Sequence, residues 1–313
     1  MSIPSRTNVT GRLAPSPTGV LHLGNARSFL LAWLSVRARG GKLFLRMEDI
    51  DGPRLKPDGD RHAIEDLAWM GLDWDGEIVR QGDRSQLYQE AAARLLEEGL
   101  AYPCVCTRKE ADAAASAPHQ DWMDAPPYPG TCRDRFDSIE DAITRTGRHP
   151  ALRFRVDREA MPFEDLFCGP QAGRIAGDFV IVKRDEGPGY QLAVVVDDAA
   201  MGIDEVLRGD DLVASTPRQL LLYEALGLAP PVFAHVPLVV GDDGRRLAKR
   251  HGDTSLRHFR EIGVSPEELV GYLAFLCGFR DRGSKCLPVD LLEDFNLGSL
   301  RRGDVLGTDH GWQ

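Results

Sequence analysis

No stretch of the chain approaches the roughly 18 consecutive apolar residues that a membrane-spanning helix needs, and its first residues lack the apolar core of a signal peptide. We therefore expect a cytoplasmic protein with no membrane partner. The chain also has no excess of basic residues, and its net charge of −10 argues against a protein that binds nucleic acid over a generally basic surface. Local clusters of Lys and Arg can still bind RNA whatever the total charge, so composition leaves that question open.

Cysteine is scarce, with six residues in 313, and half of them gather in one short stretch. In a cytosolic protein such a cluster is more typical of a metal site than of disulfides. Two thiolates one residue apart and a third from a returning segment can occupy three corners of a tetrahedron. The alternative is three reduced thiols without a metal. The clustered residues are Cys104, Cys106 and Cys132, and those expected only to pack are Cys168, Cys277 and Cys286.

The N-terminal region predicts a strand that turns directly into a helix. Residues 8–14 are typical of a short buried strand, which a Pro-rich turn ends. Apolar residues then recur at helical spacing over 25–39, and a second strand is expected over 42–46. Strand, helix and strand in this order form a parallel crossover unit, so we expect an α/β fold with a Rossmann-like half sheet.

A turn of this kind suits phosphate binding because the free N–H groups at a helix N-terminus face an anion. Gly24 allows a close backbone approach, and Thr18 and His22 supply hydrogen-bond donors just before the helix. Much later, Arg246-Leu-Ala-Lys249-Arg250 predicts a mobile basic loop after the last strand of the sheet. By itself such a run is typical of a solvated loop, but paired with the first motif it predicts a positive charge placed on bound phosphate.

The rest of the chain alternates between strand-like and helical patterns. The C-terminal residues after 276 are rich in Gly, Asp and Arg and are expected to be loose. Helices are expected over 57–70, 84–98, 211–226, 256–262 and 266–276, and strands over 152–156, 179–182, 192–196 and 234–240.

The run from Arg12 to Asn25 and the basic loop resemble the two signatures of class I aminoacyl-tRNA synthetases, which form an aminoacyl-adenylate from ATP. Residues 9 to about 260 resemble the catalytic part of glutamyl-tRNA synthetases. The sequence departs from these family signatures at two places. Asn25 stands where the first signature has its last His, and the basic loop lacks the first Lys and the Ser of the second signature. The resemblance therefore implies that Lys249 supplies more of the positive charge on the phosphates than it would in a loop with two lysines.

The resemblance also implies a glutamate pocket. Glu48 resembles the group that receives the substrate ammonium, and Arg12 and Arg208 supply a cation for each carboxylate. The implied glutamate-binding residues are Arg12, Leu13, Ala14, Pro15, Ser16, Glu48, Tyr190 and Arg208. ATP, with Mg²⁺, is implied to bind Thr18, His22, Gly24, Asn25 and Lys249, of which His22 and Lys249 are catalytic.

The cysteine cluster requires a fourth ligand if it holds a metal, and His119 and Tyr128 are the local candidates. Ligand softness favours His. The spacing Cys-x-Cys…Tyr-x-x-x-Cys, however, resembles the zinc site of a glutamyl-synthetase relative in which Tyr is the ligand. The resemblance therefore implies one structural Zn²⁺ held by Cys104, Cys106, Tyr128 and Cys132.

The expected organisation is a Rossmann-like class I synthetase catalytic domain, split by a zinc-bearing insertion and followed by a short helical region. Its halves are 1–103 and 150–254, the insertion is 104–149, and 255–313 resembles a stem-contact region. About 60 residues after the basic loop are too few for an anticodon-binding domain as well. The resemblance therefore narrows to the truncated paralogues, the glutamyl-queuosine tRNA(Asp) synthetases.

Such paralogues activate L-glutamate with ATP without tRNA and transfer it to queuosine at the wobble position of tRNA-Asp. The resemblance implies these substrates here, with the anticodon loop of tRNA-Asp as the partner and a monomeric protein. Three alternatives stay open: a minimal or truncated glutamyl-tRNA synthetase that charges the 3′ end of tRNA-Glu, another nucleotidyltransferase with the same ATP motifs, and a non-catalytic zinc- and tRNA-binding protein.

Overall fold

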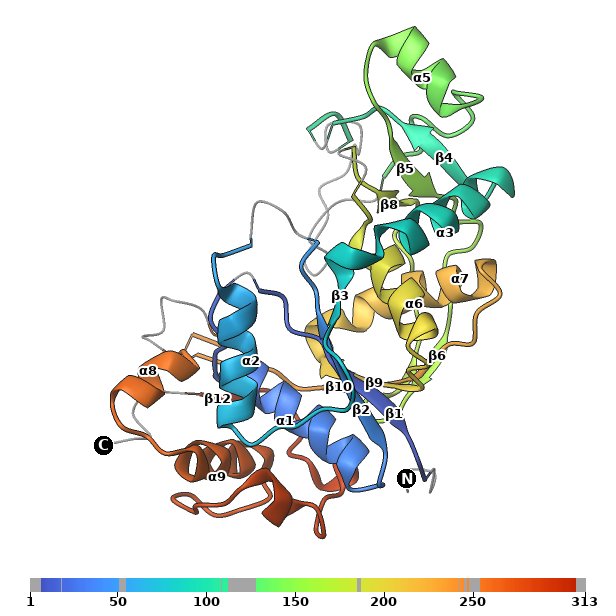
Figure 1. The fold of residues 1–313 in the computed structure, drawn as a ribbon. Helices are drawn as coiled ribbons and strands as arrows, with labels where there is room; N and C mark the ends of the chain where they lie inside the picture. Colours follow the sequence, from blue (N-terminus) through green and yellow to red (C-terminus); the bar gives the residue numbers. More distant parts are fainter. Residues whose placement is uncertain are drawn as a thin grey trace.

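The computed structural model describes residues 7–17, 19–50, 55–107, 109–111, 128–184, 187–241, 243–244, 247 and 254–307. Figure 1 shows an elongated molecule, with the segment around α5, β4 and β5 at one end and α8 and α9 at the other. Among the described residues, no helix is long and apolar enough to cross a membrane.

Two sheets, parallel except for the antiparallel strand β7, form the centre of the fold. The first has the order β1-β2-β3, and the second has the order β7-β6-β10-β9 with β10 parallel to β6 and β9. The strands of the first are β1 (Thr10–Leu13), β2 (Lys42–Met47) and β3 (Val79–Arg80). Those of the second are β6 (Phe163–Asp165), β7 (Gly169–Gln171), β9 (Glu205–Gly209) and β10 (Val232–Val236).

The two sheets meet between β1 and β9. The backbone N–H of Asp204 donates to the carbonyl of Thr10 at 3.0 Å, and the N–H of Thr10 donates to Oδ1 of Asp204 at 2.9 Å. Helix α1 (Leu23–Arg37) packs against both strands. Gly11 permits this packing, because a Cβ there would lie 2.5 Å from the Val36 side chain. Ligands of α/β sheets bind beyond the carboxyl ends of strands at such a switch point, so this edge is where a site is expected.

An antiparallel sheet, in the order β4-β5-β8, borders the segment predicted to be an insertion. Its strands are β4 (Ala101–Cys104), β5 (Ala151–Phe154) and β8 (Phe179–Val182), and α5 (Ile139–Thr146) lies between the first two. Tyr102, Phe136 and Ala142 form a small separate core there with the cysteine cluster.

Most expected helices are present within a few residues of the predicted bounds. The stretch expected as a helix over 211–226 begins as a 3₁₀ turn over Asp210–Ser215. The helices are α2 (Gly59–Trp69), α3 (Ser85–Glu97), α7 (Thr216–Ala225), α8 (Leu256–Glu261) and α9 (Pro266–Cys277).

The strand expected over 192–196 is wrong, because this stretch lies inside helix α6 (Tyr190–Ala200). Its three consecutive valines favour a strand by propensity. All residues from Leu192 to Asp198 are nevertheless buried. A helix buried on all sides and a buried strand both show a continuous apolar run in the sequence, so periodicity does not distinguish them.

Two expectations near the C-terminus also need correction. The strand predicted over 234–240 is interrupted at Pro237 and continues as β11 (Val239–Val240). The segment expected to be loose is packed over its described residues. There Leu291, Leu297, Leu300 and Val305 are at most 4% exposed, and β12 (Val305–Leu306) pairs with β11. Its scattered apolar residues have no regular period, so periodicity missed them.

Candidate active site

One cavity of about 670 Å³ lies beyond the carboxyl ends of β1 and β9. Residues far apart in the sequence border it together, as the switch point predicts. The predicted site residues among its lining are Arg12, Ala14, Pro15, Ser16, His22, Gly24, Asn25, Glu48, Tyr190 and Arg208. Leu13 is instead fully buried in the core, since alternate residues of β1 point to opposite faces. Thr18, Lys249 and His119 lie outside the described residues.

Two buried arginines face this cavity. Arg12 and Arg208 are 7% and 5% exposed, and they come from the ends of β1 and β9. Arg12 lies 3.5 Å from a carboxylate oxygen of Asp198 and donates to the Leu207 carbonyl at 3.5 Å. Burying a cation is costly unless it is paired, so a cavity lined by two of them is suited to an anionic ligand.

Glu48 supplies a carboxylate to the same cavity. It follows β2, and its Oε1 accepts a hydrogen bond from Arg46 at 3.0 Å. Burial raises the pKa of Glu48, and the nearby guanidinium groups of Arg46 and Arg12 only partly oppose this effect. A ligand ammonium would favour the charged form of Glu48, which completes a pocket for a ligand with both signs of charge.

The glutamate binding that the sequence predicts for this pocket should depend on pH. The pKa of Glu48 lies above its ordinary value of 4.5, and the ionised form is the one that receives an ammonium. We therefore expect the KM for glutamate in ATP–pyrophosphate exchange to rise as the pH falls through that elevated pKa. Glu48→Gln should have a high KM with little pH dependence in this range. A wild-type KM that stays constant down to pH 4.5 would contradict the assigned role.

The first turn of α1 borders the cavity through His22, Gly24 and Asn25. The backbone N–H of His22 donates to Oδ1 of Asn25 at 3.3 Å, which ties the turn to the helix. A Cβ on Gly24 would come 3.3 Å from the His22 ring, so glycine lets the ring lie over the helix N-terminus. The positive end of the helix dipole at that terminus favours a phosphate.

Leu247 of the basic loop and the residues from Thr254 onward lie beside this turn. Leu247 donates its N–H to the carbonyl of Val239, a cavity residue, at 3.3 Å. On the far side, Leu23 donates to the carbonyl of Thr254 at 3.1 Å, and Leu256 donates to that of Leu21 at 2.9 Å. The one described residue of the second motif, Leu247, is therefore hydrogen-bonded to a residue that lines the cavity.

The three clustered cysteines lie together in the inserted segment and could hold a metal ion. Their sulfur atoms are all within 4.8 Å of one another. The Tyr128 hydroxyl is 3.4 Å from the sulfurs of both Cys104 and Cys106, and Cys106 is 3.4 Å from Cys132. Sulfur ligands about 2.3 Å from a tetrahedral zinc are about 3.8 Å apart, so the donor set fits such an ion.

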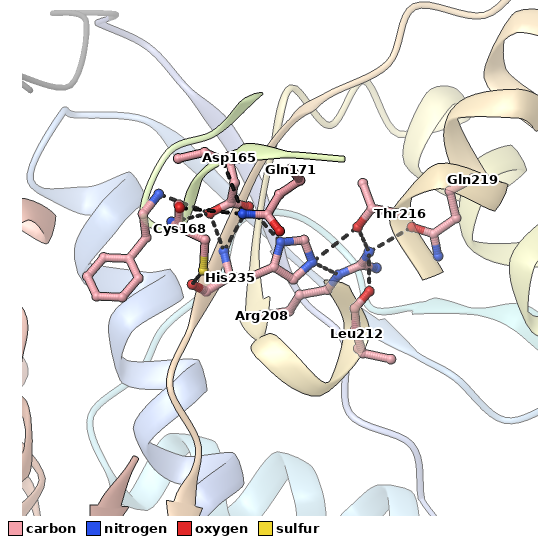
Figure 2. A network of polar contacts seen from close by, with 10 residues as sticks. Asp165, Cys168, Gln171, Arg208, Leu212, Thr216, Gln219 and His235 are labelled. Atoms are coloured by element: carbon pink, nitrogen blue, oxygen red, sulfur yellow. Dashed lines mark hydrogen bonds and ion pairs between the residues drawn. The ribbon is translucent and has the colours of Figure 1, made fainter. Parts of the chain in front are cut away.

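Sequence reasoning missed a group of polar residues behind Arg208. Asp165, Thr216, Gln219 and His235 are each at most 2% exposed, and they come from β6, α7 and β10. Figure 2 shows that they form one hydrogen-bonded network around the guanidinium, in which His235, Thr216 and Gln219 contact Arg208 and Asp165 contacts His235. None belongs to a motif with a recognisable spacing, because the tertiary structure alone brings these elements together.

Comparison with known proteins gives consistent matches over most of the chain. Residues 8–288 match the model of the family described as class I tRNA synthetases (E and Q), catalytic domain. A protein of Symbiobacterium thermophilum named glutamyl-Q tRNA(Asp) synthetase is 50% identical over 305 residues, covering 94% of each chain. A protein of Rhodopirellula baltica with the same name is 49% identical, covering 94% of this chain and 92% of its own.

Among solved structures, the chain is similar to a glutamate tRNA ligase from Elizabethkingia meningosepticum, crystallised in complex with its amino acid. The TM-score is 0.81 with 25% sequence identity, and the match covers 97% of this chain and 68% of the other. The α/β fold expected from the sequence is thereby confirmed.

Proposed function

The chain belongs to the class I aminoacyl-tRNA synthetases of the glutamyl and glutaminyl type, which are ligases, and from that premise we propose that it transfers glutamate to queuosine in tRNA-Asp. The observation that carries this proposal is the single cavity where two buried arginines, one carboxylate and the N-terminus of α1 converge. The names of the relatives that are 49–50% identical support the choice of acceptor.

Glutamate activation follows from this arrangement. A carboxylate oxygen of glutamate attacks the α-phosphorus of ATP, the bond to the β-phosphate oxygen breaks, and pyrophosphate leaves. Glu48 holds the ammonium group of the glutamate substrate, and Arg12 and Arg208 bind the carboxylates of that substrate. His22, the first turn of α1 and Lys249 stabilise charge on the phosphates. Mg²⁺, when bound with ATP, supplies further charge neutralisation.

Transfer to the tRNA then needs a hydroxyl group as acceptor. An oxygen of the queuosine cyclopentenediol attacks the acyl carbon, the bond to AMP breaks, and the hydroxyl proton passes to the released phosphate or to water. A cis-diol resembles the terminal ribose that other members of the family acylate. A tRNA substrate is consistent with action in the cytoplasm, and we propose that a monomer suffices because the residues assigned here come from one chain.

Incubation with ATP and labelled glutamate tests this proposal. The acceptors are tRNA-Asp with queuosine, tRNA-Asp without it, and tRNA-Glu. Label on queuosine-bearing tRNA-Asp alone is expected. Label on tRNA-Glu would instead identify an enzyme like the structurally similar glutamate tRNA ligase. Absence of glutamate-dependent pyrophosphate exchange would reject activation itself.

We also propose that Cys104, Cys106, Tyr128 and Cys132 hold one structural Zn²⁺ that stabilises the inserted segment. Cys106→Ser is expected to lose the metal, because a hydroxyl is a poor replacement for a thiolate ligand. Metal analysis of the purified protein should then fall from about one zinc per chain to none. Cys168→Ser, at an exposed cysteine outside the cluster, is the control and should keep its zinc. Full zinc content in Cys106→Ser would reject this site.

A further inference from the structure

Arg208 is a buried cation whose hydrogen-bond partners among the described residues are all uncharged. Its Nη2 donates to Thr216 Oγ1 and Gln219 Oε1, both at 2.9 Å, and to the Leu212 carbonyl at 3.4 Å. Its Nε donates to His235 Nε2 at 3.0 Å. Nη1 is buried and has no hydrogen-bond partner among the residues that the structure describes. The guanidinium is therefore held on two edges, and a remaining donor is left for a ligand.

The hydrogen bond from Arg208 determines the tautomer of His235. A guanidinium has no acceptor, so Nε2 of His235 must accept and cannot carry a hydrogen. The hydrogen of the neutral ring is then on Nδ1, which lies 2.6 Å from Oδ2 of Asp165. Burial lowers the pKa of His235, and Arg208 adds to this effect, while Asp165 opposes it. The ring is thus neutral at neutral pH.

Asp165 is itself fixed by the backbone around it. Its Oδ1 accepts from the N–H groups of Phe167, Cys168 and His235 at 3.0, 2.8 and 3.1 Å. These hydrogen bonds leave Oδ2 directed at the His235 ring (Figure 2). The carboxylate therefore orients the imidazole, while the imidazole separates this negative charge from the positive charge of Arg208.

We propose that His235, oriented by Asp165, is a positioning residue that holds Arg208 for a substrate carboxylate without neutralising it. A carboxylate in direct contact with Arg208 would hold the guanidinium equally well, but it would compete with the substrate for the same charge. A neutral imidazole acceptor fixes the direction of Nε and leaves the charge to the ligand. This inference rests on the proposed binding of glutamate and deepens it.

Two variants of His235 separate its two hydrogen bonds. His235→Asn keeps an N–H near the position of Nδ1 for Asp165 but has no acceptor that reaches Arg208. His235→Gln places its amide oxygen near the position of Nε2 and so restores that acceptor. We expect His235→Asn to raise the KM for glutamate in pyrophosphate exchange about 10–100-fold, as for loss of a hydrogen bond to a charged group. His235→Gln should recover most of this loss.

Asp165→Asn tests the tautomer with almost no change in shape. The three backbone N–H groups keep the amide oxygen at the position of Oδ1, so the NH₂ group takes the place of Oδ2 and faces Nδ1. His235 must then carry its hydrogen on Nε2, where it meets the N–H of Arg208. We expect a raised KM for glutamate with an unchanged KM for ATP. Cys168→Ala, which loses only a contact to the His235 carbonyl, is the control and should resemble the wild type.

Unfolding midpoints should be measured for all variants, and midpoints close to that of the wild type exclude a general loss of structure. Equal KM values for glutamate in His235→Asn and His235→Gln, or a wild-type value in Asp165→Asn, would overturn the inference. Pyrophosphate exchange needs no tRNA, so these results are independent of the acceptor. Wild-type exchange without labelling of queuosine-bearing tRNA-Asp would reject the proposed acceptor and leave the positioning role intact.

Discussion

Replacement of Lys249 by alanine is expected to slow glutamyl-adenylate formation by about 10²–10³-fold, the usual cost of losing one group that stabilises charge in a transition state. The basic loop has only one lysine, since Arg246 takes the place of the first Lys of the family signature. Charge on the leaving pyrophosphate therefore depends on Lys249 more than in a loop with two lysines. Single-turnover measurement of adenylate formation gives the rate directly.

The binding of glutamate should be almost unaffected by this substitution. The residues assigned to the amino acid lie in β1 and the turn after it, directly after β2, in α6 and in β9, and none comes from the basic loop. Calorimetric titration of glutamate should therefore give the same dissociation constant for Lys249→Ala and the wild type. Lys249→Arg, which keeps the charge, should recover part of the rate. Wild-type turnover in Lys249→Ala would remove its assigned role.

Replacement of Arg46 by methionine is expected to cost about 3–5 kcal/mol of the free energy of unfolding, as for a buried ion pair that loses one partner. Arg46 is fully buried, and its nitrogens lie 2.5 Å from Asp198, 3.0 Å from Glu48 and 3.9 Å from Asp197. Burial alone would lower the pKa of Arg46, but these three carboxylates raise it above its ordinary value.

The three carboxylates would not lose the same share of their hydrogen bonds in Arg46→Met. Asp197 keeps hydrogen bonds from Gln81, Arg84 and Tyr88, whereas Glu48 loses the arginine that holds it. We therefore expect a raised KM for glutamate as well as a lower urea midpoint. Arg61→Met is a matched control, because Arg61 forms an exposed pair with Glu65 on α2. Equal midpoints for the two variants would contradict the structural role of Arg46.

The local elements that frame the cavity could be predicted because their signals lie in short stretches of sequence. The strand, turn and helix over residues 8–39 have a buried run, a Pro-Gly break and a helical period in succession. Helix α9 likewise begins with a Ser265 and Glu268 capping box and ends at Gly278. Helix α6 could not be predicted in this way, because a helix buried on all sides loses the period that distinguishes it from a strand.

The sequence by itself determined the chemical groups that the protein offers: a turn predicted to bind phosphate, a basic loop, and an order of charged residues that resembles a glutamate pocket. Only the tertiary structure decided which side chains act on one another. It brought β1 and β9 together at the switch point, buried Arg46 among three carboxylates, and placed Asp165 and His235 behind Arg208. The physical reason is distance along the chain. Local patterns follow from the nearest few residues, whereas Asp165 and His235 are separated by 70 positions, and only the pairing of β6 with β10 in one sheet makes them neighbours.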